Sequence, residues 1–132
     1  MNVSGTAAGN IVRGTVPGVV EAETALVGAA YYASGSAATA PLVTPLLTAA
    51  EAVPIVGGGL VAGAIGGNLY EEAATSMGAS KVVAKGSGVA GAILTGAAVG
   101  ALIGSPTGIG APIGAVIGGA VGLIGYGLSQ WL

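Results

Sequence analysis

The final third of the chain, residues 86–132, contains no charged residue. A helix that crosses the hydrocarbon core of a bilayer needs about 20 consecutive apolar residues, so this stretch is long enough for two spans and a turn. A segment rich in glycine with one proline, 105–111, interrupts it and predicts the turn. The sequence therefore predicts a transmembrane helical hairpin with spans at 86–104 and 112–131.

Glycine recurs every four residues within both predicted spans. Four-residue steps place these positions along one slanted ridge of a helix, and a ridge of glycines lets a second helix approach to backbone contact. Glycine costs about 0.8–1 kcal/mol relative to alanine inside a helix in water, whereas a bilayer enforces helical hydrogen bonding from outside. We therefore expect glycine-zipper packing between helices at Gly59, Gly63, Gly67, Gly96, Gly100, Gly104, Gly108, Gly110, Gly114, Gly118 and Gly122.

The composition favours an all-α membrane protein over a soluble domain or a β-barrel. Only 6% of residues are charged and 53% are hydrophobic, so the chain lacks the charged shell of a soluble domain. The spans hold Val and Ile but no alternation of polar and apolar residues, which a barrel strand would show. The predicted fold class is an integral membrane helical hairpin with two to four membrane-associated helices.

The region before the hairpin is harder to divide. We expect an irregular N-terminal arm at 1–18, helical or interfacial segments at 19–53, and a polar linker at 71–85. Between them, 54–70 is a possible transmembrane helix that opens with Pro54, because proline is tolerated in the first helical turn. At 1.5 Å per residue this segment reaches roughly 25 Å, slightly less than a hydrocarbon core of about 30 Å. The number of spans before residue 71 stays open.

Three aromatic residues, Tyr70, Tyr126 and Trp131, lie near the ends of the predicted spans. Tyr and Trp favour the membrane interface, so we expect these side chains there, with ordinary packing as the alternative. Lys81 and Lys85 precede the hairpin, and the positive-inside rule places their linker on the cytoplasmic side or its equivalent inside a virion.

The residue types for common catalytic and metal sites are missing. The chain has no Cys and no His, which removes thiolate nucleophiles, histidine bases and the usual zinc ligands. Glu71 and Glu72 are sequence neighbours and would diverge on a helix, so they do not resemble a working carboxylate pair. Three basic residues make no patch for nucleic acid. We expect no catalytic residue, no cofactor and no metal, and hence no enzyme.

The run VGGGLVAGAIGGNLYEEAATS resembles the glycine-zipper region of colicin V-like and double-glycine-leader bacteriocins. In those proteins Gly/Ala ladders are followed by a Tyr and an acidic residue, which correspond here to Tyr70 and Glu71. The small, Ala/Gly-rich and nearly uncharged chain is also similar in texture to viral membrane proteins. Polyomavirus minor capsid proteins and the internal membrane or ejection proteins of phages share that texture.

Three functions are compatible with these features. The first is a structural or membrane-penetrating component of a virion membrane or a host inner membrane, in which copies associate through their glycine ridges. The second is a pore-forming bacteriocin or toxin, and the third is a small accessory subunit of a larger membrane complex. The expected partners are the lipid bilayer and either further copies or a larger protein assembly.

Overall fold

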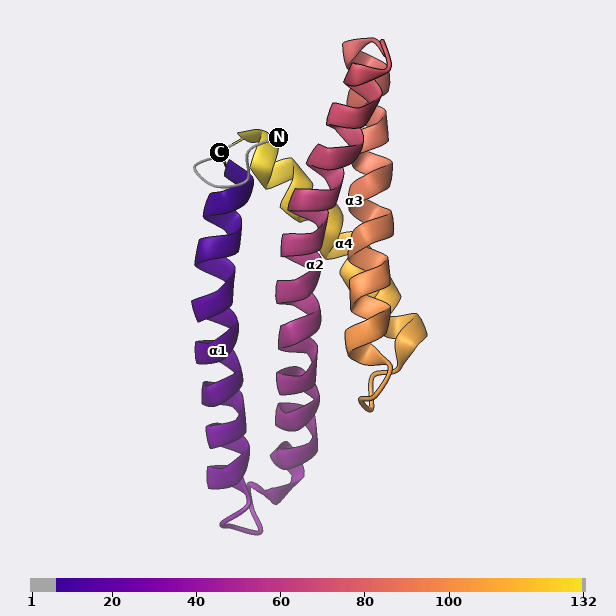
Figure 1. Cartoon of the computed structure of the whole chain (residues 1–132). Coiled ribbons are helices and arrows are strands. Elements are labelled where there is room, and N and C mark those ends of the chain that lie inside the picture. The colour runs from indigo at the N-terminus through magenta and orange to yellow at the C-terminus, as the bar shows by residue number, and fades with distance from the viewer. Residues whose placement is uncertain (1–6, 132) are drawn as a thin grey trace.

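The computed structural model describes residues 7–131, which form helices joined by short turns (Figure 1). In that part of the chain there is no strand, so the all-α prediction is confirmed. The elements are α1 (Ala7–Ala33), a short 3₁₀ helix η1 (Ala40–Leu42), α2 (Val43–Ser76), α3 (Lys81–Gly104) and α4 (Ala111–Trp131).

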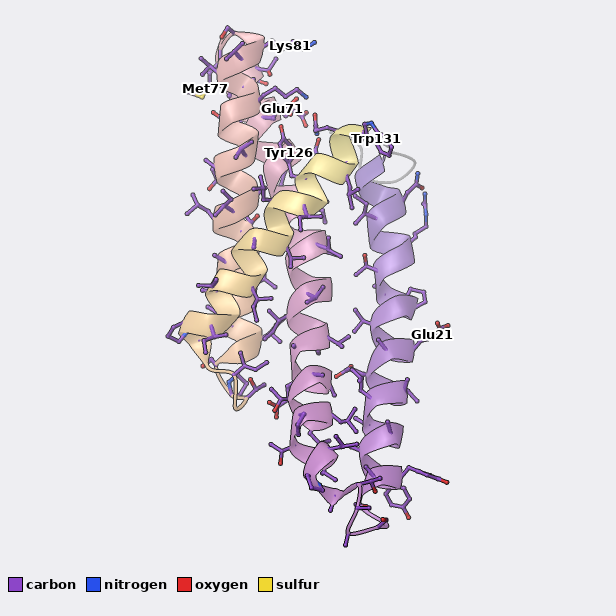
Figure 2. The ribbon with its side chains drawn as sticks, turned by 180° about the vertical axis from the view of Figure 1, so that it is seen from behind. Glu21, Glu71, Met77, Lys81, Tyr126 and Trp131 are labelled. Carbon is purple, nitrogen blue, oxygen red and sulfur yellow. The ribbon has the colours of Figure 1, made fainter. Side chains whose placement is uncertain are left out.

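Helix α2 is the centre of the molecule because it packs extensively against each of the other α-helices, whereas α4 touches α1 only slightly. Helix α1 runs antiparallel along one side of α2, and α3 lies along another (Figure 1). Helix α4 crosses α2 and α3 obliquely, and its end comes back to the start of α1 (Figure 2). Among residues 7–131, three segments are long and apolar enough to cross a membrane: Ala40–Ser76, Lys81–Gly104 and Ala111–Trp131.

The turns on either side of α3 explain where the helices stop. Before α3, Gly78 adopts a positive φ of 89°, and the Ser80 side chain caps the helix by accepting the N–H of Val83 at 3.3 Å. After α3, Gly110 adopts a positive φ of 82° and donates its N–H to the Gly104 carbonyl at 3.1 Å. The turn expected at 105–111 is thus found one residue shorter. Helix α4 begins one residue before the predicted span, whereas α3 begins at Lys81, five residues before the predicted start at 86.

The prediction of an irregular arm at 1–18 is wrong from Ala7 onward, where α1 begins; residues 1–6 lie outside the described part. Ile11, Thr15 and Val19 recur at helical spacing and face α2, so burial of this side stabilises the helix. Pro17 lies inside α1 on the exposed side.

The predicted segments at 19–53, 54–70 and 71–85 have different bounds in the structure. Helix α2 joins the end of the first to the whole of the second and continues through Ser76, with Pro54 inside it. Only 77–80 separates α2 from α3, so the expected polar linker is largely helical. Proline removes one backbone hydrogen bond from a helix, and the buried side chains of Ala50 and Ile55 hold α2 together on both sides of Pro54.

Candidate functional site

Polar residues lie at two levels of the bundle, about one hydrocarbon thickness apart. Glu51 and Glu71 are 20 positions apart on α2, which corresponds to about 30 Å at 1.5 Å per residue, the thickness of a bilayer core. At the first level, the Glu51 carboxylate lies 3.5 Å from the Cβ position of Gly108 in the α3–α4 turn. At the second, Glu71 meets Lys85 at the start of α3. The uncharged parts of α2, α3 and α4 therefore occupy the same layer.

Helices α3 and α4 touch backbone to backbone inside this layer. A Cβ added at Gly100 would lie 2.9 Å from the Cα of Gly118, and one added at Gly96 would lie 2.9 Å from the Cα of Gly122. A Cβ added at Gly104 would lie 2.7 Å from the carbonyl oxygen of Gly110. Real Cβ atoms essentially never approach other atoms below 3.0 Å, so these positions accept glycine alone in the present packing.

Helix α4 also touches α2 through the same glycines. A Cβ added at Gly59 would lie 3.0 Å from the Gly118 carbonyl oxygen, and one added at Gly63 would overlap the backbone of Gly122. Gly118 and Gly122 thus contact α2 on one side and α3 on the other. The close packing seats α4 in the groove between the two helices, where it gains dispersion contacts along its length.

The structure separates the glycines predicted to mediate packing into two groups. Gly108 and Gly110 both lie between α3 and α4, so their first role is in the turn. The others lie at contacts between helices of one chain: Gly59, Gly63, Gly67, Gly96, Gly100, Gly104, Gly114, Gly118 and Gly122. The ridges that we expected to join copies are therefore occupied within the chain.

Further glycines at helix contacts lie outside the four-residue series and were not predicted. A Cβ added at Gly91 would lie 2.6 Å from the Cβ of Tyr70, and one added at Gly58 would lie 2.7 Å from Cδ1 of Ile103. Gly88 contacts the ring of Tyr126. Of these three, Gly88 could have been predicted, because Gly88 and Ala92 extend the ladder of α3 when alanine is counted as a small residue.

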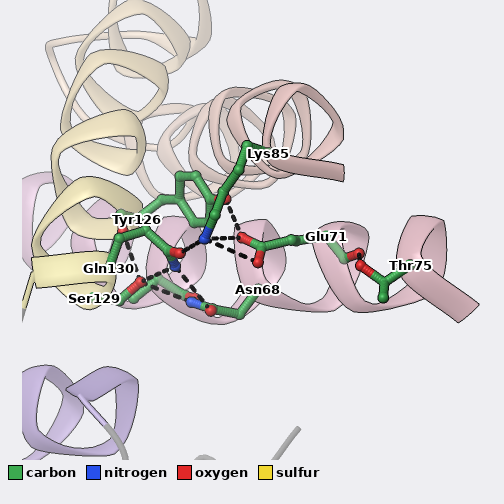
Figure 3. Close-up of polar contacts among 8 residues, drawn as sticks. Asn68, Glu71, Thr75, Lys85, Tyr126, Ser129 and Gln130 are labelled. Atoms are coloured by element: carbon green, nitrogen blue, oxygen red, sulfur yellow. Dashed lines mark hydrogen bonds and ion pairs between the residues drawn. The ribbon is translucent and has the colours of Figure 1, made fainter. Parts of the chain in front are cut away.

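A polar cluster joins three helices at the Glu71 level (Figure 3). The Lys85 ammonium lies 3.0 and 3.1 Å from the two carboxylate oxygens of Glu71. The Tyr126 hydroxyl donates to the same carboxylate, and Lys85 also donates to the Gln130 side-chain oxygen. Glu71 on α2 therefore accepts bonds from both α3 and α4, and it links the three helices at one point.

Asn68 extends the cluster one turn further into the layer. Its side-chain amide donates to the Ser129 hydroxyl at 2.7 Å and to the Ala64 carbonyl at 2.6 Å. Its oxygen accepts the Gln130 amide at 3.1 Å. These bonds fix the end of α4 against α2 and satisfy polar groups at the boundary of an apolar layer.

The three aromatic residues predicted at the membrane interface have different surroundings. Trp131 is 85% exposed at the end of α4, and Tyr70 is 45% exposed with its ring against Gly91. Tyr126 is only 3% exposed, and its ring fills the space above Gly67 and Gly88. Tyr126 is therefore packed between helices at the level of Glu71, and the interface location expected for the three residues stays a prediction.

Residues 7–131 contain no group of three His, Cys, Asp or Glu side chains placed to hold a metal ion. The two grooves that run along the contact of α1 with α2 are lined almost entirely by apolar residues, including Val19, Gly57 and Leu60. The contacts described above pack the helices tightly and fix the ends of α2, α3 and α4.

Comparisons with protein-family models, curated proteins and solved structures found no match.

Proposed function

We propose that this chain is a non-enzymatic structural or membrane-penetrating protein of a virion membrane or a host inner membrane. One observation carries the proposal: three apolar helices pack through glycine between two polar levels that lie about 30 Å apart, the thickness of a bilayer core. In this arrangement α2, α3 and α4 form their backbone hydrogen bonds within each helix inside the layer, and Glu51, Glu71 and Lys85 lie at its two boundaries.

The packing of α4 supports a structural role over transport. Its glycines lie at backbone contact with both α2 and α3, at Gly118 and Gly122. A solute path between these helices would need space that even an added methyl group does not have. The apolar outer faces, which include Leu94, Leu102 and Val116 at 59%, 75% and 73% exposed, suit contact with acyl chains.

The hairpin formed by the end of α1 and the start of α2 supports the membrane-penetrating part of the proposal. Residues 24–50 carry no charge, and this hairpin extends past the α3–α4 turn (Figure 1). Tyr31 and Tyr32, near its tip, are 84% and 87% exposed. An uncharged tip with exposed tyrosines is suited to a bilayer surface, where amphipathic aromatic rings are favoured.

The membrane placement is tested by expressing the chain in bacteria and extracting the membranes with alkaline carbonate. We expect the protein to stay with the lipid pellet, whereas recovery in the soluble fraction would refute the proposal. The virion role is tested separately by density-gradient sedimentation of particles from the natural source. Copurification with particles supports it, and recovery in cell membranes alone refutes it.

A pore is the second candidate, and one observation favours it. Helix α1 carries Arg13 on its exposed side at the depth of the apolar layer, and ionisable residues at that depth commonly face water. Purified protein in liposomes would then release an entrapped dye, and retention of the dye would exclude the pore.

A further inference from the structure

The outer face of α1 carries a row of exposed residues at helical spacing. The opposite face, with Ile11, Thr15 and Val19, contacts α2. Figure 2 shows Glu21 pointing away from the other helices. The row, which we name the α1 stripe, consists of Asn10, Arg13, Pro17, Glu21 and Thr24. Steps of three and four residues place these positions on one side of a helix.

The α1 stripe lies at the depth of the apolar layer. Ile11 clusters with Ala64, and a Cβ at Gly57 would meet the side chains of Thr15 and Val19. This antiparallel register places Arg13 roughly 14 Å below the level of Glu71, close to the middle of the layer. An arginine at that depth is unfavourable against lipid unless it is paired or faces water. In residues 7–131, the Arg13 guanidinium donates to the side-chain oxygen of Asn10 beside it in the stripe. The ion pair joins Lys85 and Glu71, so neither Arg13 nor Glu21 has an oppositely charged partner in that part of the chain.

The stripe is symmetric in spacing about Pro17, and the charged residues at equal distances from Pro17 have opposite signs. Its successive steps are three, four, four and three residues. When two copies of a helix pack antiparallel around residue 17, Arg13 of each copy faces Glu21 of the other, and Asn10 faces Thr24. A two-fold axis pairs residues in this reciprocal way. Next to the stripe, a Cβ added at Gly14 or Gly18 meets no atom within 4 Å, so a second helix can approach closely.

We propose that a second copy of this chain docks antiparallel on the α1 stripe and pairs Arg13 with Glu21 twice. A parallel pair would place Arg13 against Arg13 and Glu21 against Glu21, which is unfavourable at low dielectric. The antiparallel pair requires the two copies to cross the membrane in opposite orientations, so the inference rests on the membrane placement proposed above. Its axis at Pro17 lies about 5 Å from the middle of the layer, so the apolar layers of the two copies are offset by about 10 Å and overlap over about 20 Å.

Disulfide cross-linking in membranes tests this geometry, since the native chain has no cysteine to interfere. We expect Pro17→Cys to form a dimer with itself and Asn10→Cys to cross-link only when coexpressed with Thr24→Cys. In the antiparallel pair the two copies of residue 10 stand about 21 Å apart along the helices. Self-cross-linking of Asn10→Cys would show a parallel pair and overturn the proposal. The absence of a cross-link at Pro17→Cys would also overturn it.

Charge reversal tests the pairing of Arg13 with Glu21, and the measured quantity is the fraction of protein cross-linked through Pro17→Cys. Arg13→Glu or Glu21→Arg alone should lower the cross-linked fraction by about tenfold or more, as expected when one partner of a close charge pair is lost. The double variant Arg13→Glu/Glu21→Arg should restore it, and Glu23→Arg, outside the stripe, should leave it unchanged. Single variants that cross-link normally would refute the charge pairing. Carbonate extraction of the same samples reports the membrane placement independently of the pairing.

Discussion

Gly118 of α4 lies at backbone contact with Gly100 of α3, because a Cβ added at Gly100 would stand 2.9 Å from the Gly118 Cα. Gly118 meets α2 as well, since its carbonyl oxygen lies 3.0 Å from the Cβ position of Gly59. Three helices thus converge where the middle one has no side chain, and this convergence determines how the bundle responds to substitution.

Gly118→Ala should destabilise the bundle strongly. The added methyl group overlaps backbone that cannot rotate away, and overpacking a well-packed core costs about 1–3 kcal/mol or more. The measurement is the free energy of unfolding in detergent, titrated with a denaturing detergent. Gly28→Ala is the matched control, because a Cβ there meets no atom within 4 Å, and it should leave the stability equal or slightly higher. Equal losses in both variants would contradict the close contact.

Two substitutions at Tyr126 should separate its hydroxyl from its ring. Tyr126→Phe loses the bond to Glu71, and we expect a loss of about 1 kcal/mol, the net value of a typical hydrogen bond. Tyr126→Ala also empties the space above Gly67 and Gly88, and a loss of about 3–5 kcal/mol is typical of a buried aromatic ring. Unfolding in detergent measures both. A Phe variant as unstable as the Ala variant would show that the ring packs little.

The Lys85–Glu71 pair should contribute modestly to stability. The two side chains are 42% and 23% exposed, so solvent screens their attraction and a coupling energy of at most about 1 kcal/mol is expected. A double-mutant cycle with Glu71→Gln and Lys85→Met measures it. Raising the salt concentration should weaken the coupling, and a salt-independent value would indicate packing of the side chains in place of charge attraction.

Limited proteolysis should report the depth of each basic residue. Trypsin has three possible sites, Arg13, Lys81 and Lys85. In sealed vesicles we expect cleavage after Lys81 in those copies whose α2–α3 turn faces outward, and protection of Arg13, which lies within the layer. Denaturing detergent should expose all three sites. Cleavage at Arg13 in intact vesicles would show that α1 lies outside the bilayer.

The hairpin could be predicted from sequence because its signals are local. The uncharged stretch after Lys85 indicates where the two spans lie, and Pro106 with the glycines around it marks the turn. The ladders from Gly96 and from Gly110 follow from helical spacing alone. Residues that act through near neighbours in the chain, or through a fixed period, leave a pattern in one sequence.

The polar cluster and α1 could not be predicted in the same way. Glu71 and Tyr126 are 55 positions apart, and their contact depends on the angle at which α4 crosses α2. Helix α1 has Thr15 and small residues on its buried side and Pro17 on the exposed side. The helical periodicity of its apolar residues is therefore weak. The extension of α2 through Ser76 likewise brings Glu71 to Lys85 and Tyr126, which reach its carboxylate from other helices.

The position of α4 has a consequence for biosynthesis. The ribosome makes α2 and α3 before α4, so the backbone of Gly59 and Gly100 has no helix against it while α4 is still in the exit tunnel. During that interval the groove between α2 and α3 is open to acyl chains. In a membrane, acyl chains that entered the groove in that interval would have to leave before α4 could reach backbone contact with Gly59 and Gly100.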